Sequence, residues 1–338
     1  MIPNNCILLQ KYFFVENTEY WYAVVNPEAG SGRGLRDWPK IKVLLNELDI
    51  NFKHSTTQRK YHAIELTVNA VRNGFRKIMV VGGDGTLNEV VNGIFIQNIC
   101  NPNDITIGVI GVGTGNDWQR TYNLPNNYKG KILAIKEGRT ILQDVGEVRF
   151  FEARIQQSRY FANAAGVGFD AKVALATNRL KEDGRKGKML YLFSLLKTLY
   201  HYRTTTTKIT IDNHKLDGKI FSATLGIGKY NGGGMLQVPN ALPDDGLFDI
   251  TVIQKIRKCN VVRNIFRLYN GTILNHPKVL GYQGKSIAIS SKPPLSLEVD
   301  GESLGTSPFT FSIVPRSIRV IVGADFSSIN NPITTLYN

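Results

Sequence analysis

The sequence predicts two domains: an α/β domain with a mostly parallel sheet, followed by a β-rich sandwich domain. In residues 20–145, short apolar runs alternate with stretches whose apolar residues recur at helical spacing, which is typical of a parallel sheet covered by helices. After Val145 the chain changes to short runs of Val, Ile, Phe and Thr separated by turn residues, and this pattern predicts antiparallel strands. A chain of 338 residues is long enough for two hydrophobic cores.

The first predicted strand, Tyr22–Val25, ends in a glycine-rich loop. The loop at 26–34 reads N-P-E-A-G-S-G-R-G, and helical periodicity follows it from Trp38 to Leu48. Another helix is predicted over Tyr61–Asn73, after a polar loop at 55–60. A strand, a loop and a helix in this order form the repeating unit of an α/β sheet.

The second glycine-rich loop is the most informative stretch of the chain. The apolar run Ile78–Val81 breaks into G-G-D-G-T at 82–86, and apolar residues then recur at helical spacing from Leu87 to Ile94. Glycines let a backbone approach phosphate closely, and the N–H groups and dipole of a helix start favour an anion. Asp84 suits this loop if Mg²⁺ accompanies the phosphates or if the chemistry needs a base. The alternative is a tight turn in which Asp84 is a solvated cap.

A third strand, Ile107–Ile110, ends in the loop G-V-G-T-G-N-D at 111–117. Three strands that end in such loops are expected to bring them together at the carboxyl edge of the sheet, where ligands bind. The loops contain neither G-x-x-x-x-G-K-[ST] nor G-x-G-x-x-G. This argues against a standard P-loop NTPase and a standard Rossmann dehydrogenase.

In the second half of the chain, the expected strands are interrupted by a helix over 255–275. The apolar stretch Met189–Tyr202 is too short to span a membrane, and we expect it to be a core or interface helix. The predicted strands are Lys208–Asp212, Lys219–Ile227, Phe248–Ile253, Ser286–Ser290, Leu295–Val299 and Phe309–Val314.

Taken together, the three loops resemble the catalytic domain of the diacylglycerol kinases, which sphingosine and ceramide kinases share. The chain looks most like the soluble bacterial lipid kinases of that family, and the likeness runs in family order from about residue 22 to about residue 325. In the second half it rests on N-A-A-G-V-G-F-D at 163–170, G-G-G at 232–234, P-D-D-G-L-F-D at 243–249 and V-D-G-E at 299–302.

The resemblance implies an NAD kinase/diacylglycerol kinase-like first domain formed by residues 1–145 with 316–338, because the last strand and tail return to it. Residues 146–315 would form the β-sandwich lipid-substrate domain. The implied activity is transfer of the γ-phosphate of ATP, with Mg²⁺, to the hydroxyl of a lipid. Diacylglycerol, sphingoid bases and ceramide are the acceptors to be considered.

The same resemblance identifies the residues of the nucleotide site. Thr57 has the weakest support among them, because a polar loop residue before a helix needs no ligand. The implied nucleotide-binding residues are Asn26, Pro27, Glu28, Ala29, Gly30, Thr57, Gly83, Asp84, Gly85, Thr86, Leu87, Asn88, Glu89 and Thr114.

Three carboxylates are candidates for catalysis. The resemblance makes Glu302 the first candidate for the general base, and Asp84 the second, because sphingosine kinases assign that role to the loop aspartate. Asp300 joins them, since Asp300 and Glu302 flank one glycine at the end of an apolar strand. Residues two apart in a strand point to one face, although the glycine allows a turn that changes this geometry. The alternative is an ordinary hairpin turn.

A metal site is implied at the P-D-D-G-L loop. In bacterial relatives the equivalent loop binds a structural Mg²⁺ through one carboxylate and backbone carbonyls, which corresponds here to Leu242, Asp245 and Leu247. The alternative is a β-turn without metal. Asp117 and Asp144 are expected to join a network of water and metal.

The net charge of +14 points to an anionic partner. The sequence contains no nucleic-acid motif, which leaves an anionic membrane or a small acidic substrate. A basic cluster from Arg179 to Lys188 precedes the apolar stretch and could lie on an anionic bilayer, or it could be a solvated loop. Three scattered cysteines and the lack of a signal peptide or spanning segment favour a cytoplasmic protein, peripheral at the inner face of the membrane. Bacterial relatives are often dimers, so the resemblance allows a homodimer.

Two other classes of function stay open at this point. The G-G-D-G motif also occurs in NAD kinases and 6-phosphofructokinases, so a phosphotransferase that acts on a soluble acceptor is one alternative. A non-catalytic nucleotide- or lipid-binding module is the other. The N-P-x-x-G loop and the β domain with its D-G-E motif favour the lipid branch, and the retained acidic residues argue against loss of activity.

Overall fold

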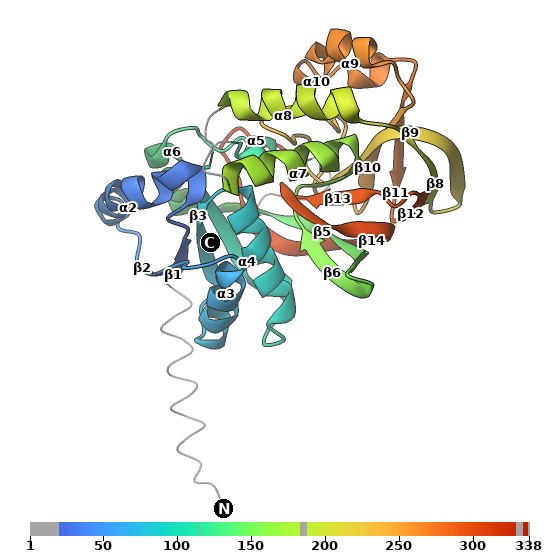
Figure 1. The fold of residues 1–338 in the computed structure, drawn as a ribbon. Coiled ribbons are helices and arrows are strands. Elements are labelled where there is room, and N and C mark those ends of the chain that lie inside the picture. Colours follow the sequence, from blue (N-terminus) through green and yellow to red (C-terminus); the bar gives the residue numbers. More distant parts are fainter. Residues whose placement is uncertain (1–19, 114, 183–187, 329–333, 337–338) are drawn as a thin grey trace, which may run out of the picture. The chain divides into compact units, whose positions relative to one another are not determined.

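The computed structural model describes residues 20–113, 115–182, 188–328 and 334–336 (Figure 1). The chain divides into two compact units. The first unit is Met1–Gln143 with Arg316–Asn338, and the second unit is Asp144–Pro315. Among the described residues, no helix is both long enough and apolar enough to cross a membrane.

The first unit is built on a parallel sheet, as the sequence predicts. Its strands lie in the order β4-β3-β1-β2, and the end of the long strand β14 pairs with β4 in parallel through Arg319 and Val320. The end of the chain therefore returns to this sheet, and β15 (Thr334–Thr335) pairs with the start of β5. The strands are β1 (Trp21–Val25), β2 (Phe52–Thr56), β3 (Lys77–Gly82), β4 (Thr106–Gly111), β5 (Arg139–Glu152) and β14 (Glu302–Ile321).

Helices cover both faces of this sheet. Helix α3 (His62–Arg72) packs on α4 (Asp84–Ile96), and α2 (Ala29–Glu47) packs on α6 (Tyr128–Glu137) (Figure 1). Because β2 and β3 flank β1 on opposite sides, right-handed crossovers place α2 on one face and both α3 and α4 on the other. The short elements η1 (Pro102–Asp104) and α5 (Asp117–Thr121) lie before and after β4 in the sequence.

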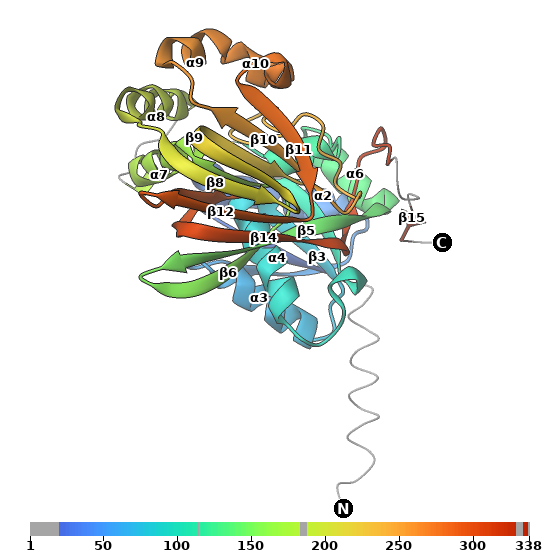
Figure 2. The same ribbon diagram turned by 90° about the vertical axis from the view of Figure 1, so that its right-hand side faces the viewer.

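The second unit is an antiparallel β structure in which two long strands bend. The pairings β9-β7-β13-β14-β12-β8 return to β9, so β9 and β14 each contribute to both layers of a sandwich (Figure 2). This confirms the β-rich second domain. The further strands are β6 (Ile155–Phe161), β7 (Ala164–Gly168), β8 (Thr205–Ile211), β9 (His214–Gly226), β10 (Phe248–Gln254), β11 (Val279–Gly284), β12 (Ser286–Lys292) and β13 (Ser296–Val299).

The core of the sandwich is aromatic. The ring of Phe161 stacks on that of Phe248, with 5.7 Å between their centroids, and meets Phe311 edge-on at 6.4 Å. All three side chains are fully buried. A Cβ at position 146 would lie 2.3 Å from the Phe161 ring, so Gly146 leaves the space that this ring fills.

A helical layer covers one side of the second unit. Helix α7 (Phe169–Glu182) packs on α8 (Lys188–His201), and the two share a small core with Leu195 and Leu199. Leu196 and Tyr200 on the same helix are exposed, so α8 is amphipathic. The single helix expected over 255–275 is instead two short helices, α9 (Lys258–Asn264) and α10 (Phe266–Tyr269), and the turn η2 (Ile273–Asn275). The left-handed Gly271, with φ 74°, ends the α-helical stretch.

Candidate active site

The candidate site of the first unit lies where the strand order changes direction. From β1 the chain passes to β2 on one side and then to β3 on the other. In open α/β sheets this switch point is where ligands bind, beyond the carboxyl ends of the strands. The loops after β1 and β3 meet here, because Asn26 Nδ2 donates to Thr86 Oγ1 at 2.9 Å. The structure thus brings together the first two predicted nucleotide loops.

The loop after β1 is held by backbone contacts that only glycine permits. Asn26 Oδ1 accepts from the N–H of Glu28 at 3.0 Å, which turns the chain directly after the strand. Gly30 is left-handed with φ 62°, and a Cβ there would lie 2.1 Å from the carbonyl oxygen of Val112. The loop after β1 therefore packs backbone to backbone against the loop after β4.

The loop after β3 leads directly into a helix start. Gly83 is extended and is the N-cap of α4, and it supplies no side chain there. Val112 N donates to Gly82 O at 2.9 Å, which joins this loop to the loop after β4. The positive end of the α4 dipole faces the switch point, as expected for a site that binds phosphate.

Asp84 lies in the loop after β3 and also makes hydrogen bonds to the backbone of the loop after β4. Its Oδ2 accepts from Asp117 N at 3.2 Å and its Oδ1 accepts from Trp118 N at 3.3 Å, so Asp84 caps the start of α5. The carboxylate of Asp117 lies close by, because a Cβ at Gly115 would be 3.4 Å from Asp84 Oδ2 and 3.6 Å from Asp117 Oδ2. Two of the predicted carboxylates thus gather beside the glycine loops, and Arg120 Nε lies 3.6 Å from Asp117.

The remaining nucleotide residues lie on the side of α3 and α4. The two carboxylate oxygens of Glu89 accept from Tyr61 N at 3.0 Å and Ala63 N at 3.1 Å, which caps the start of α3. Thr57 is buried after β2, and its N–H donates to Val25 O at 2.8 Å. Thr114 lies outside the described residues. Its assignment to the nucleotide stays a prediction.

In the second unit, Asp300 and Gly301 form the two-residue turn between β13 and β14. Both are left-handed, with φ 47° and 88°, as a type I′ turn requires. Val299 pairs directly with Glu302 across this turn. Asp300 and Glu302 are therefore not alternate residues of one strand, and the expectation that they share one face through strand geometry is wrong.

Asp300 is an anchor for the turn. It is 4% exposed, and its carboxylate accepts from three successive backbone N–H groups of residues 162, 163 and 164, at 3.1, 3.1 and 3.0 Å. Such bonds to a charged acceptor are among the stronger ones in proteins. Glu302 opens β14 and is half-buried. Asp300 thus fixes the turn, while Glu302 stands at its edge.

Sequence reasoning missed a buried acid next to this turn. Glu298 is 3% exposed, its Oε1 accepts from Gly301 N at 2.5 Å, and its Oε2 accepts from Asn231 Nδ2 at 3.3 Å. Burial raises the pKa of Glu298 to about 8. Burial also raises the pKa of Asp170, which accepts from Thr224 Oγ1, to about 6. The only sign in the sequence is one carboxylate in an otherwise apolar strand.

The P-D-D-G-L loop keeps its oxygen-rich character in the structure. Leu247 N donates to Asp245 Oδ1 at 3.0 Å, and Gly246 N donates to Asp144 Oδ2 at 2.6 Å. Burial and the charge of Asp244 raise the pKa of Asp245. These donors fit a hard cation such as Mg²⁺. Asp117 belongs to the first unit and Asp144 to the second, and their joint network stays a prediction.

Groups of three or more His, Cys, Asp or Glu side chains that could hold a metal are absent from the part of the chain that the structure describes. A site of one carboxylate and backbone carbonyls, as predicted at Leu242, Asp245 and Leu247, is a different arrangement. That site therefore rests on its oxygen donors and on the resemblance.

The fold and the loops define a two-domain kinase with an NAD kinase-like plan, and comparison with known proteins gives the family. Residues 20–148 match the diacylglycerol kinase catalytic domain, and residues 163–322 match the YegS C-terminal NAD kinase beta sandwich-like domain. The chain is 31% identical over 303 residues to a diacylglycerol kinase of Staphylococcus haemolyticus, covering 89% of this chain and 88% of the relative. It is 30% identical over 302 residues to one of Staphylococcus carnosus, covering 89% and 94%.

Solved structures agree with this result. A putative diacylglycerol kinase from Bacillus anthracis has a TM-score of 0.71 at 25% identity, covering 91% of this chain and 98% of that one. Yeast NADH kinase, solved in complex with NADH, shares the fold with a TM-score of 0.51 at 11% identity, covering 91% and 85%. The chain belongs to the diacylglycerol kinase family, and it is a lipid kinase.

The buried acid Glu298 makes a testable contribution to stability. Its pKa is raised from 4.5 to about 8, so the folded state binds a proton that the unfolded state releases. The stability that depends on this proton is present below about pH 4.5 and is lost as the pH rises towards 8. The free energy of unfolding of the wild type should decrease from pH 5.5 to pH 8 as Glu298 ionises. In Glu298→Gln the side chain cannot ionise, so we expect the decrease over this range to be smaller by at least ~1 kcal/mol.

Urea denaturation at a series of pH values measures this difference. Glu152→Gln, at an exposed position, is the matched control and should follow the wild-type curve. Parallel curves for the wild type and Glu298→Gln would mean that Glu298 is ionised in the folded protein.

Proposed function

We propose that this protein transfers the γ-phosphate of ATP to the hydroxyl group of a membrane lipid, with Mg²⁺ and with diacylglycerol as the first acceptor to consider. The observation that carries the proposal is the meeting of the loops after β1 and β3 at the switch point, joined by the Asn26–Thr86 bond. The α4 helix start and the packed glycine loops suit the phosphates of a nucleotide.

Enzymes catalyse phosphoryl transfer mainly by positioning the reactants and stabilising charge, and the protein forms few covalent bonds itself. The lipid hydroxyl oxygen forms a bond to the γ-phosphorus, the bond from that phosphorus to the bridging oxygen breaks, and ADP leaves. The hydroxyl proton passes to a carboxylate. We assign this role to Glu302, which stands half-buried at the edge of a fixed turn. Asp84 is the second candidate, and its bonds to Asp117 N and Trp118 N favour a role in positioning the loop.

Magnesium is proposed from the family and from the donors present. When bound, it would neutralise phosphate charge, and the carboxylates of Asp84 and Asp117 lie beside the loops that would hold the phosphates. A structural ion would be held by Asp245 with the carbonyl oxygens of Leu242 and Leu247. Both places offer only oxygen donors, which Mg²⁺ prefers.

The identity of the acceptor is supported by the relatives, which are named diacylglycerol kinases. Sphingoid bases and ceramide also carry a hydroxyl group near an apolar tail and are the next acceptors to test. The soluble-acceptor alternative rests on the G-G-D-G motif and on the fold shared with NADH kinase at 11% identity, which supports the fold alone. A lipid acceptor requires a way to reach a membrane.

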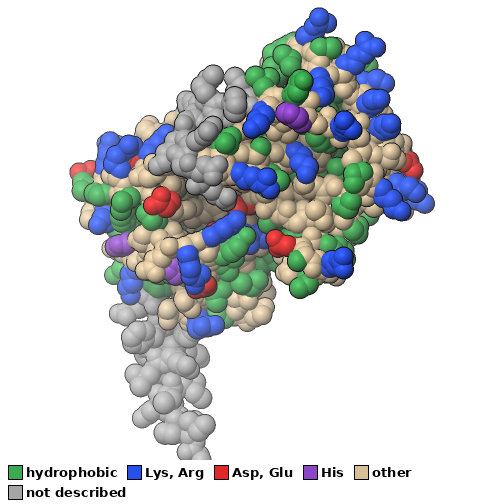
Figure 3. Space-filling view, viewed as in Figure 1, with side chains coloured by type: hydrophobic (Ala, Val, Ile, Leu, Met, Phe, Trp, Pro, Cys, Tyr) green, Lys and Arg blue, Asp and Glu red, His purple; other side chains and the backbone are tan. Residues whose placement is uncertain are grey.

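We propose that α9 and α10 of the second unit form the surface that binds the membrane. The stretch 255–275 has five Lys or Arg residues and no Asp or Glu. Val262, Phe266 and Tyr269, four and three residues apart along these helices, are each about half exposed. Figure 3 shows Lys and Arg side chains gathered over this part of the second unit, with apolar ones among them. Cations around exposed aromatic residues suit the interface of an anionic bilayer. The basic cluster from Arg179 to Lys188 lies largely outside the described side chains.

Replacing the apolar side chains tests the membrane surface. We expect Phe266→Ser with Tyr269→Ser to reduce binding to phosphatidylglycerol vesicles at least about tenfold, because each aromatic contributes apolar area to the interface. Sedimentation with vesicles measures this effect. Ile155→Ser, at an exposed position on β6, is the matched control. Equal binding of the double variant and the wild type would place the membrane contact elsewhere.

Asp84→Asn tests the phosphate loops. We expect the variant to lose at least about 100-fold in kcat, because a carboxylate is removed beside the phosphates and the candidate metal. The amide still accepts one of the two N–H bonds and no core is emptied, so the free energy of unfolding should change by only about 1 kcal/mol. Steady-state transfer assays and urea denaturation measure the two effects. Unchanged turnover would defeat the proposed mechanism.

Glu302→Gln separates the base from the binding groups. If Glu302 takes the hydroxyl proton, kcat should fall about 100-fold while the KM for ATP changes by less than about threefold. Glu152→Gln serves as the control. A loss confined to the KM for ATP would reassign Glu302 to phosphate or metal positioning.

The acceptor is identified by a labelling experiment. ATP labelled in the γ-phosphate is incubated with Mg²⁺ and mixed micelles that contain diacylglycerol, sphingosine or ceramide, and NAD is tested in solution. Label on diacylglycerol supports the proposal, and label on another lipid changes the acceptor only. Label on NAD alone moves the protein to the soluble-acceptor class, and no label on any acceptor contradicts the proposed function.

A further inference from the structure

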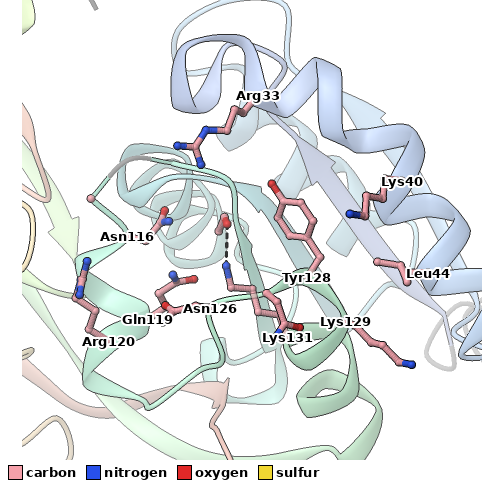
Figure 4. A pocket seen from close by; sticks show the side chains of 13 residues that line it. Arg33, Lys40, Leu44, Asn116, Gln119, Arg120, Asn126, Tyr128, Lys129 and Lys131 are labelled. Carbon is pink, nitrogen blue, oxygen red and sulfur yellow. Dashed lines mark hydrogen bonds between the residues drawn. The ribbon is translucent and has the colours of Figure 1, made fainter. Parts of the chain in front are cut away.

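The first unit contains a cationic cavity beside the loop after β4. It has a volume of about 450 Å³ and lies between α2, the end of β4, α5 and the start of α6. Five cations line it: Arg33 and Lys40 from α2, Arg120 from α5, and Lys129 and Lys131 from around the start of α6 (Figure 4). Within the described residues, no Asp or Glu lines this cavity.

Lys131 is the buried cation of this cavity. Its side chain is 2% exposed, and its Nζ donates to Gly111 O at 2.9 Å. Among the residues that the structure describes, no carboxylate lies within ion-pair distance of Nζ. Burial and the nearby Arg33 lower the pKa of Lys131 to about 8. A buried ammonium has three donors and needs an opposite charge, and an anion in the cavity would supply it.

The cavity also offers hydrogen-bond acceptors that have no donor. Gln119 is 5% exposed, and its Oε1 has no hydrogen-bond partner among the residues that the structure describes. The Oδ1 of Asn116 likewise has no partner within the described part of the chain, while its Nδ2 donates to Gly113 O at 2.9 Å. Both residues line the cavity (Figure 4). Tyr128 cannot serve these acceptors, because its hydroxyl donates to Asp37 Oδ2 at 2.7 Å. A buried acceptor without a donor is costly, so the ligand should bring a donor of its own.

These two requirements together define a chemical group. An anion is needed beside the buried Lys131, with Arg33 close enough to lower its pKa, and an O–H or N–H donor is needed for Gln119 and Asn116. A phosphate group with one proton meets both, because its hydroxyl donates while its other oxygens accept from the cations. Inorganic phosphate keeps a hydroxyl at neutral pH, whereas a phosphate monoester, with a second pKa of about 6, would bind as its monoanion. Sulfate has the charge but no hydroxyl.

The cavity borders two of the nucleotide loops, because Arg33 lies three residues after Gly30 in the sequence and Asn116 two residues after Thr114. It lies on the other face of the sheet from Thr57 and Glu89. Thr57 and Glu89 lie with α3 and α4, and Glu89 caps α3, whereas the cavity lies with α2 and α6. Right-handed crossovers place these helix pairs on opposite faces. The two sites share the loop after β4, where Lys131 holds Gly111 O and Asp84 holds the N–H of Asp117.

We propose that this cavity binds a phosphate group, on Lys131 and Arg33 with Gln119 as acceptor, at a site distinct from the nucleotide site. The phosphate has two sources, a soluble phosphate or the headgroup of a phospholipid that carries a phosphate monoester. Either one would rest against the backbone of the loop after β4.

Calorimetry with inorganic phosphate tests the site directly, with and without a saturating non-hydrolysable ATP analogue and Mg²⁺. We expect phosphate to bind under both conditions, and sulfate to bind at least about fivefold more weakly because one hydrogen bond is missing. Lys131→Met should weaken phosphate binding at least about tenfold. Arg33→Gln should weaken it as well, which keeps the test valid if Lys131→Met fails to fold. Lys136→Met is the matched control, since it removes a half-exposed lysine from the same helix.

Vesicles distinguish the two sources. Weaker binding of Lys131→Met than of the wild type to phosphatidylcholine vesicles that contain phosphatidic acid identifies the headgroup. Equal vesicle binding, with the calorimetric loss retained, identifies soluble phosphate. The proposal is overturned if the ATP analogue abolishes phosphate binding, because the anion then occupies the nucleotide site. It is also overturned if Lys131→Met binds phosphate like Lys136→Met. None of these measurements requires phosphoryl transfer, so they stand apart from the proposed kinase reaction.

Discussion

The first unit depends on backbone-to-backbone packing of its three glycine loops. A Cβ at Gly30 would lie 2.1 Å from Val112 O, and a Cβ at Gly34 would lie 1.9 Å from Asn26 O. No side chain fits at either distance. The first contact joins the loop after β1 to the loop after β4, and the second closes the loop after β1 on itself. The Asn26–Thr86 bond and the cap that Asp84 places on α5 complete the arrangement. Glycines here do more than admit a ligand, because they hold the loops at one fixed spacing before any ligand arrives.

Both units also bury charged groups without a full counter-charge. Lys131 is buried with a lowered pKa, whereas Glu298 and Asp170 are buried with raised pKa values. Burial disfavours the charged form of each group, which shifts acids and bases in opposite directions. Such groups reduce stability, and they gather near ligand sites more often than chance would place them. In this chain they flank the loop after β4 and the turn between β13 and β14.

The sequence predicts the parts of the fold that local patterns determine. Strands β1, β3 and β4 are apolar runs followed by glycine-rich loops, so their position and their loops follow from neighbouring residues. Lys131 and Glu298 could not be found this way. Lys131 looks like any exposed cation on an amphipathic helix, and only the packing of α6 beside the end of β4 buries it. The roles of Asp300 and Glu302 depend on a turn, and the strand-alternation rule does not apply across it.

The turn between β13 and β14 separates two tasks that adjacent carboxylates could otherwise share. Three backbone N–H groups donate to the carboxylate of Asp300, which commits this side chain to holding the turn. Glu298 lies on the other side of the turn and holds Gly301 N. With the turn fixed from both sides, Glu302 can stand at its edge without spending conformational entropy during the reaction. A catalytic base gains more from a rigid support than from a shifted pKa when the transition state is largely dissociative, because the proton leaves late. This makes Glu302, rather than Asp300, the carboxylate of the D-G-E motif that is suited to the chemistry.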